Sequence, residues 1–264
     1  MKNEITDNSI MNNNPAKEER ANPAYGVAIV LAAGSGKRMH SDVAKQFLEL
    51  KGKPILCYSL DAFEKSPEID EIILVAAADS IEYCKTQIVE KYQYSKVTHI
   101  VEGGKERYHS VWNALKAACE NAVNVICGNV YIHDGARPFV SEEIIKRNSV
   151  ALLEDQACVT SVPSKDTIKI ADEDGYVSTT PKRSLVRNIQ TPQSFYFPVI
   201  FNAFDKLIRD EEKILGDGIQ ITDDAMVVEL FEQIKVRLVE GSYDNIKITT
   251  PDDLILAEKI YECQ

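Results

Sequence analysis

Long apolar runs are absent from this sequence of 264 residues, which contains no uninterrupted stretch of the roughly 18 residues that a membrane-spanning helix needs. The first 22 residues are rich in asparagine and charge, and nothing in them is typical of a signal peptide. We therefore expect no membrane partner and a cytoplasmic location. Residues 1–22 are predicted to be a disordered tail, and residues 23–264 one α/β domain.

Signatures of metal clusters and disulfide frameworks are also missing. The six cysteines are widely spaced without a Cys-x-x-Cys pair, and the four histidines show no metal-ligand spacing. Reduced, packed thiols are the simpler interpretation of this pattern.

Positive charge is in short supply. The formal net charge is −11 at pH 7, and the 30 Lys and Arg residues are scattered along the chain. Binding to duplex nucleic acid needs a concentrated basic face, so no nucleic-acid partner is expected. Any phosphate ligand must be held by a local cluster of cations, which favours a pocket over an open surface.

What the sequence does contain is an alternation of strand and helix patterns. Residues 26–33 form a continuous apolar run, as expected of a strand buried on both faces. Further strands are predicted at 71–77, 96–101 and 129–133, and helices at 54–65, 80–91 and 106–120, with another helix beginning at Ser141. This rhythm predicts a Rossmann-like α/β fold, with a mostly parallel sheet and helices on both faces.

From Ala157 the rhythm changes. Short alternating segments around the dipeptide Asp174-Gly175 predict a β-hairpin arm, at about 163–186, inserted in the main domain. The predicted strands of this half are 159–162, 167–170, 176–179, 235–239 and 245–248, and the predicted helices are 198–208, 223–233 and 251–261.

Polar and unusual sequence gathers at the predicted carboxyl ends of strands, where open α/β sheets bind their ligands. The first such loop, 34–38, matches neither the Walker A motif nor the dinucleotide fingerprint. Its two glycines beside two cations nevertheless suit a loop that wraps a triphosphate. A glycine turn with solvated charges explains the segment alone equally well.

Two later loops also contain residues that could form part of a ligand-binding site. In the 103–107 loop, glycines would let a base or ribose approach the backbone, and Ser110 could face a base edge. A flexible turn before an amphipathic helix is the simpler interpretation of that loop alone. In 133–138, Asp134 can hold a hydrated divalent cation, and Arg137 can meet the ligand. A structural Asp134–Arg137 ion pair is the alternative.

Taken together and in order, these segments resemble the 2-C-methyl-D-erythritol 4-phosphate cytidylyltransferases over about residues 27–260. The resemblance implies transfer of CMP from CTP to a sugar-alcohol phosphate, with release of pyrophosphate. It also implies Mg²⁺ or another divalent cation as cofactor. Finally, it implies a homodimer in which the arm reaches around the partner.

The resemblance also implies residue roles by position. The loop over the CTP phosphates would comprise Ala32, Ala33, Gly34 and Gly36. The catalytic cations would be Arg38, Lys45 and Lys247. Cytosine and ribose would be recognised by Gly104 and Ser110, with Asp134 and Arg137 beside them. The sugar-alcohol phosphate would contact Thr167 and Arg183 across the dimer, and also Thr191 and Thr222.

The implied reaction needs no general base, because the attacking phosphate is already an anion. His133 is therefore expected to be structural. Two departures from the family pattern concern the site: Ala44 precedes Lys45 where a proline is common, and Lys105 replaces a frequent acid.

Two alternatives remain open. Ribitol-5-phosphate cytidylyltransferases share the glycine loop, the QTPQSF stretch and the NIKITTP ending, although the segments at 133–137 and 222–225 favour the erythritol enzymes. A non-catalytic nucleotide-binding protein on the same fold is the other alternative.

Overall fold

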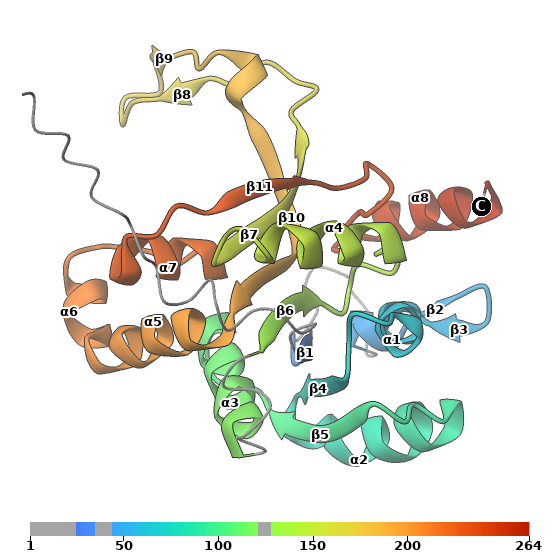
Figure 1. Ribbon diagram of the computed structural model, residues 1–264. Helices are drawn as coiled ribbons and strands as arrows, with labels where there is room; N and C mark the ends of the chain where they lie inside the picture. The colour runs from blue at the N-terminus through green and yellow to red at the C-terminus, as the bar shows by residue number, and fades with distance from the viewer. Residues whose placement is uncertain (1–24, 35–43, 121–127, 264) are drawn as a thin grey trace, which may run out of the picture.

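A seven-stranded sheet forms the centre of the protein, in the order β11-β7-β10-β6-β1-β4-β5 (Figure 1). The computed structural model describes residues 25–34, 44–120 and 128–263, so the predicted tail lies outside the described residues. The strands are β1 Gly26–Ala32, β4 Glu71–Ala76, β5 Val97–Glu102, β6 Asn129–Asp134, β7 Ala157–Pro163, β10 Arg187–Tyr196 and β11 Arg237–Glu240.

Most of the strand pairs are parallel. β1 lies between β4 and β6, β4 also pairs with β5, and β7 pairs with β11, all in parallel. Only β10 is antiparallel to its neighbours in this sheet, β6 and β7. The predicted Rossmann-like, mostly parallel fold is thus confirmed.

Helices cover both faces of the sheet (Figure 1). On one face lie α3 (Arg107–Glu120), α5 (Phe197–Arg209) and α7 (Asp224–Glu232), which share one apolar cluster with β1 and β6. On the other face lie α1 (Ile55–Lys65), α2 (Ile81–Tyr83) with the π-helical turn that continues it (Cys84–Glu90), and α4 (Glu142–Leu152). Within the described residues, no helix is long and apolar enough to cross a membrane.

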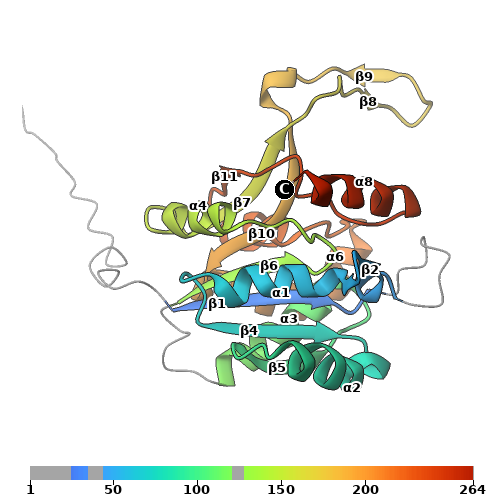
Figure 2. The same cartoon turned by 90° about the vertical axis from the view of Figure 1, so that its right-hand side faces the viewer.

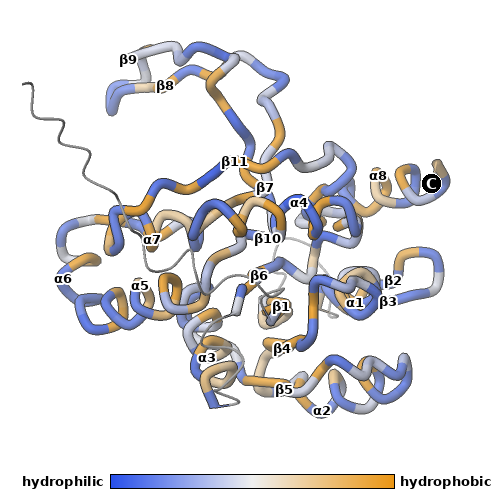
Figure 3. Tube along the Cα trace, in the orientation of Figure 1, coloured by the Kyte–Doolittle hydropathy of each residue, from blue (hydrophilic) through white to orange (hydrophobic). Residues whose placement is uncertain are grey.

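Apolar sequence explains this layering. Six of the seven residues of β1 are buried, as are all six of β4, and Figure 3 shows apolar colour along these strands. Fully buried side chains such as Phe63 and Phe204 lie on opposite faces. Burying each contributes roughly 1.5–3 kcal/mol, so the two clusters hold the strand ends in fixed positions.

A smaller apolar cluster supports the C-terminal segment. It joins α8 (Pro251–Glu262) to the ribbon of β2 (Glu49–Leu50) and β3 (Lys53–Pro54). Leu50, Phe139 and Ile248 are buried within it. Because Ile248 is fixed there, the neighbouring Lys247 is held beside the end of β6.

The predicted hairpin arm leaves the sheet between β7 and β10. Its strands β8 (Ile170–Ala171) and β9 (Val177–Thr179) pair in antiparallel fashion, and Gly175 has the positive φ of 86° expected of the predicted turn. Figure 2 shows the arm standing clear of the sheet and its helices. The first strand is shorter than predicted, since it begins at Ile170 rather than at Thr167.

One element was predicted wrongly, and several observed elements were not predicted. Residues 245–248 are not a strand, because the backbone there bonds to the loop after β6, through Ile248 N to Ala136 O at 2.9 Å. Strand β10 was not predicted, because Pro192 interrupts its pattern. In the sheet, this proline lies in the irregularity between Ile189 and Gln193, where a missing N–H is tolerated. The short α6 (Glu211–Gly216) and the β2–β3 ribbon were not predicted either.

Candidate active site

Two cavities open at the carboxyl ends of the central strands. The first, of about 400 Å³, is lined by Leu31, Ala32, Ala33, Gly34, Lys45, Gln46, Gly104, Lys105, Glu106, Arg107, Ser110, Asp134, Ala136 and Lys247. The second, of about 350 Å³, is lined by Arg107, Asp134, Arg137, Ile189, Gln190, Thr191, Gln193, Thr222, Asp223 and Lys247. Among the described residues, only Arg107, Asp134 and Lys247 line both, so the cavities meet at these three side chains.

The glycine loop contributes one wall of the first cavity. Ala32 ends β1, and Ala33 and Gly34 follow it. Gln46 fixes the next segment to them by donating from Nε2 to the Ala32 carbonyl at 2.6 Å. This bond is buried and positions the short helix that carries Lys45. Two further predicted residues, Gly36 and Arg38, lie outside the described residues.

The loop after β5 forms the opposite wall. The backbone N–H of Gly104 donates to Ser110 Oγ at 3.0 Å, and that hydroxyl donates to the Glu106 carbonyl at 3.3 Å. Gly103 packs so tightly that a Cβ there would lie 2.3 Å from the Cβ of Ala33. Ser110 therefore lines the cavity and also shapes the loop that faces the glycine wall.

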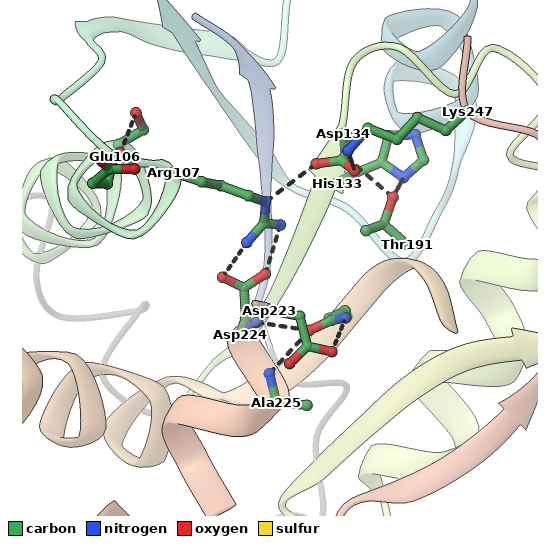
Figure 4. Close-up of polar contacts among 11 residues, drawn as sticks. Glu106, Arg107, His133, Asp134, Thr191, Asp223, Asp224, Ala225 and Lys247 are labelled. Carbon is green, nitrogen blue, oxygen red and sulfur yellow. Dashed lines mark hydrogen bonds and ion pairs between the residues drawn. The ribbon is translucent and has the colours of Figure 1, made fainter. Parts of the chain in front are cut away.

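Asp134, at the end of β6, is the charged centre of the site (Figure 4). Its Oδ2 lies 2.8 Å from Lys247 Nζ, and its Oδ1 lies 3.4 Å from Arg107 Nε. Burial alone would raise the pKa of Asp134, but Arg107 and Lys247 together lower it well below the ordinary range. The carboxyl group is therefore ionised at neutral pH.

Arg137 does not pair with Asp134, so the structural ion pair considered from the sequence was wrong. Its Nη1 instead donates to the Asn245 carbonyl at 2.7 Å. This contact holds the segment that carries Lys247. Arg137 lines the second cavity and not the first, although it was expected beside the nucleotide.

A chain of three hydrogen bonds connects the backbone N–H of Asp134 to Thr191, His133 and the Arg137 carbonyl. The Arg137 carbonyl can only accept, so His133 Nε2 carries the proton that it donates over 3.2 Å. His133 Nδ1 then accepts from the Thr191 hydroxyl at 3.0 Å, and Thr191 Oγ1 accepts from the Asp134 N–H at 3.1 Å. Burial lowers the pKa of His133 to about 4, so it is neutral at pH 7. The geometry fits the structural role expected for His133.

The residues that were expected to contact the sugar-alcohol phosphate lie in two separate parts of the structure. Thr191 and Thr222 line the second cavity. Thr167 and Arg183 lie exposed on the arm and line neither cavity of the described chain. Their expected role across a dimer stays a prediction.

The ion pair between Arg107 and Asp224 was not predicted from the sequence. Arg107 Nη1 and Nη2 each lie 2.7 Å from one oxygen of this fully buried carboxylate (Figure 4). Both residues stand in segments that the sequence had marked as polar, but the pair joins positions 117 residues apart. No local pattern identifies such a partner.

Metal-binding capacity in the site depends on Asp134. The described residues contain no group of three or more His, Cys, Asp or Glu side chains that could hold a metal ion. An ion bound here would thus need oxygen ligands from phosphates as well.

Comparison with known proteins gives one consistent family. A family model described as 2-C-methyl-D-erythritol 4-phosphate cytidylyltransferase matches residues 27–262. A protein of that name from Lachnospira eligens is 50% identical over 230 residues, which cover 87% of this chain and 96% of that protein. Another from Clostridium kluyveri is 48% identical over 235 residues, covering 89% and 96%.

Solved structures agree. The crystal structure of a 4-diphosphocytidyl-2C-methyl-D-erythritol synthase from Anaerococcus prevotii has a TM-score of 0.77 and 37% identity to this chain. The match covers 94% of this chain and 99% of that one. A 2-C-methyl-D-erythritol 4-phosphate cytidylyltransferase from Francisella tularensis has a TM-score of 0.69 and 30% identity, covering 90% and 100%.

Proposed function

The chain belongs to the 2-C-methyl-D-erythritol 4-phosphate cytidylyltransferase family, and from this we infer that it transfers CMP from CTP to 2-C-methyl-D-erythritol 4-phosphate. The products are 4-diphosphocytidyl-2-C-methyl-D-erythritol and pyrophosphate. The enzyme is therefore a nucleotidyltransferase of isoprenoid precursor synthesis.

The observation that carries this function is the meeting of the two cavities at Asp134, Arg107 and Lys247. We assign CTP to the first cavity, between the glycine loop and the loop after β5. The sugar-alcohol phosphate is assigned to the second. A phosphate oxygen in the second cavity would then attack the α-phosphorus at their junction, and pyrophosphate would leave on the far side.

Catalysis in this arrangement depends on position and charge. No histidine lines either cavity in the described part of the chain, and His133 is buried and neutral. The attacking phosphate needs no base, while negative charge accumulates around phosphorus. Lys45 in the first cavity and Lys247 at the junction are the described cations that we propose to stabilise it, together with Arg38.

We propose Mg²⁺ as cofactor, held by Asp134 and the phosphates of the nucleotide. Mg²⁺ is commonly bound by one or two carboxylates plus substrate phosphates, so a single aspartate fits this use. Of the two oxygens, Oδ1 is the less engaged, since its contact with Arg107 is long at 3.4 Å. A bound ion would neutralise charge on the phosphates, and EDTA should abolish turnover.

We also propose a homodimer in which each arm completes the partner's second cavity. Several large apolar side chains on the arm are exposed, among them Ile170 (50%), Tyr176 (74%) and Leu185 (77%). Exposed apolar groups concentrated on one projecting hairpin favour a protein interface. Sedimentation analysis should give twice the mass of the chain.

Mixed dimers test the shared site directly. Each variant, Arg183→Ala and Lys45→Ala, should be inactive alone, because every site contains one defect. Purified heterodimers of the two should regain activity, because one of the two sites then has both residues intact. Heterodimers with no more activity than either parent would overturn the assignment of Arg183.

The substrate is tested by offering CTP and Mg²⁺ with methylerythritol phosphate or with ribitol 5-phosphate, and by measuring pyrophosphate. We expect release with the former. Turnover of ribitol phosphate alone would support the alternative enzyme, and binding of CTP without turnover of either would indicate a non-catalytic protein. Cytoplasmic location remains a prediction from the sequence.

A further inference from the structure

Arg107 forms the wall between the two cavities, yet no role follows for it from the sequence pattern. It is the first residue of α3, directly after the glycine-containing loop that follows β5. Its side chain is about one-third exposed, at 32%, and it lines both cavities. The side chain therefore lies where the two cavities adjoin.

The plane of the guanidinium group is fixed by Asp224. Both terminal nitrogens are used in a bidentate pair with this carboxylate, at 2.7 Å each. A guanidinium group is rigid and planar, so the direction of Nε follows from the orientation of this fork. Nε points to Asp134 Oδ1, 3.4 Å away (Figure 4).

Asp224 is itself held in place by the side chain of Gln193. The N–H groups of Asp224 and Ala225, at the start of α7, both donate to Gln193 Oε1 at 3.0 Å. The amide of Gln193, which lies on β10 and is buried, donates in turn to Asp223 at 3.0 Å. The guanidinium group of Arg107 thus rests on a helix start that is fixed to the sheet.

Charge distinguishes Arg107 from a simple phosphate ligand. The positive charges of Arg107 and Lys247 are matched by the negative charges of Asp224 and Asp134 within one connected group. Because Asp224 already neutralises Arg107 at short distance, the net attraction of Arg107 for a phosphate is small. Its directional contact with Asp134 remains.

We propose that Arg107 is a positioning residue for CMP transfer. Held by Asp224, it fixes the carboxylate of Asp134 at the point where nucleotide and sugar-alcohol phosphate meet. This proposal rests on the proposed function, since it assigns the junction to the reacting groups.

The test compares Arg107→Gln and Arg107→Lys with the parent enzyme. For Arg107→Gln we expect kcat to fall by about 10²-fold, the order of loss that a displacement of about 1 Å causes. CTP affinity, measured by calorimetry without the second substrate, should stay within about twofold. Arg107→Lys keeps the charge but not the fork, so it should not restore kcat.

A chemical rescue separates position from folding. In Arg107→Ala, millimolar guanidinium ion can enter the space left between the cavities and pair with Asp224. We expect it to raise kcat severalfold while raising the melting temperature only slightly, because a ligand present near its Kd stabilises the folded state little. The control is Arg209→Gln, which removes an arginine that is 73% exposed and paired with Asp205 on the same helix. That variant should match the parent in both measurements.

Each outcome decides the matter. If the parent enzyme releases no pyrophosphate, the proposed function fails. If the parent is active and Arg107→Gln keeps its kcat, or Arg107→Lys restores it, the positioning role is wrong. A parallel loss of kcat, CTP affinity and melting temperature would reduce Arg107 to a purely structural ion pair. If Arg107→Gln does not fold, Arg107→Lys provides the same comparison of kcat with CTP affinity.

Discussion

The hydroxyl group of Thr191 allows a sharp test of how the fold supports its charged centre. Thr191 is buried, with 4% of its surface exposed, and its Oγ1 joins the Asp134 N–H to His133 Nδ1. Replacing Thr191 with Val preserves the shape of the side chain and removes only the hydrogen-bonding capacity. Two buried polar groups then lose the partner that the structure provides.

The expected loss follows from these two groups. A buried donor or acceptor left without a partner costs about 1–3 kcal/mol, so Thr191→Val should lower the free energy of unfolding by roughly 2–6 kcal/mol. His133 cannot compensate by shifting its proton to Nδ1, because Nε2 must donate to the Arg137 carbonyl. The loss is a large fraction of the total, since domains are typically stable by about 5–15 kcal/mol.

The measurement is urea unfolding at neutral pH, with Thr191→Ser as the matched control. Serine keeps the hydroxyl and loses one methyl group, so its cost should be about 1 kcal/mol. The slopes of the unfolding curves must agree among the variants for the comparison to hold. If Thr191→Val proved as stable as Thr191→Ser, the proton assignment in this chain of hydrogen bonds would be refuted.

Three other perturbations test neighbouring parts of the site. The low pKa of His133, about 4 against an ordinary 6.5, means that unfolding takes up a proton there. The contribution of neutral His133 to the free energy of unfolding should be fully present above pH 6.5 and should fall by up to about 3 kcal/mol as the pH drops through 4. In His133→Gln, the free energy of unfolding measured in EDTA should therefore depend less steeply on pH in this acid range. Lys247→Gln should lower kcat by about 10²–10³-fold, since it removes the cation at the junction, and steady-state kinetics with an unchanged kcat would contradict this. Gly103→Ala forces a Cβ to within 2.3 Å of Ala33, so the KM for CTP should rise, and an unchanged KM would place the nucleotide elsewhere.

The sequence by itself determined the layers of the fold and the edge that carries the site. The apolar run at 26–33 and the helix starts at Ser141 and Pro251 are local signals, and the structure contains them nearly as predicted. Loops rich in glycine and charge follow the strands, and these loops lie close together because parallel strands all end at one edge of the sheet. These features depend on periodicity and on neighbouring residues, which a sequence displays directly.

Only the tertiary structure decided which charges meet. Asp134 pairs with Lys247 and Arg107 rather than with Arg137, which is three residues away in sequence. Arg107 in turn reaches a carboxylate 117 residues further along the chain. The physical reason is that an ion pair is selected by packing between distant elements, here α3, β6 and α7, and no sequence interval encodes that distance.

Contacts between elements that are distant in sequence also explain the two errors in the secondary structure predicted for the C-terminal half. Strand β10 exists because β6 and β7 hold it on both sides, despite a proline that weakens its own pattern. The segment 245–248 has an apolar alternation typical of a strand, but its backbone bonds to the loop after β6 instead. In both cases the pairing partner, which lies far away in sequence, overrode the local preference.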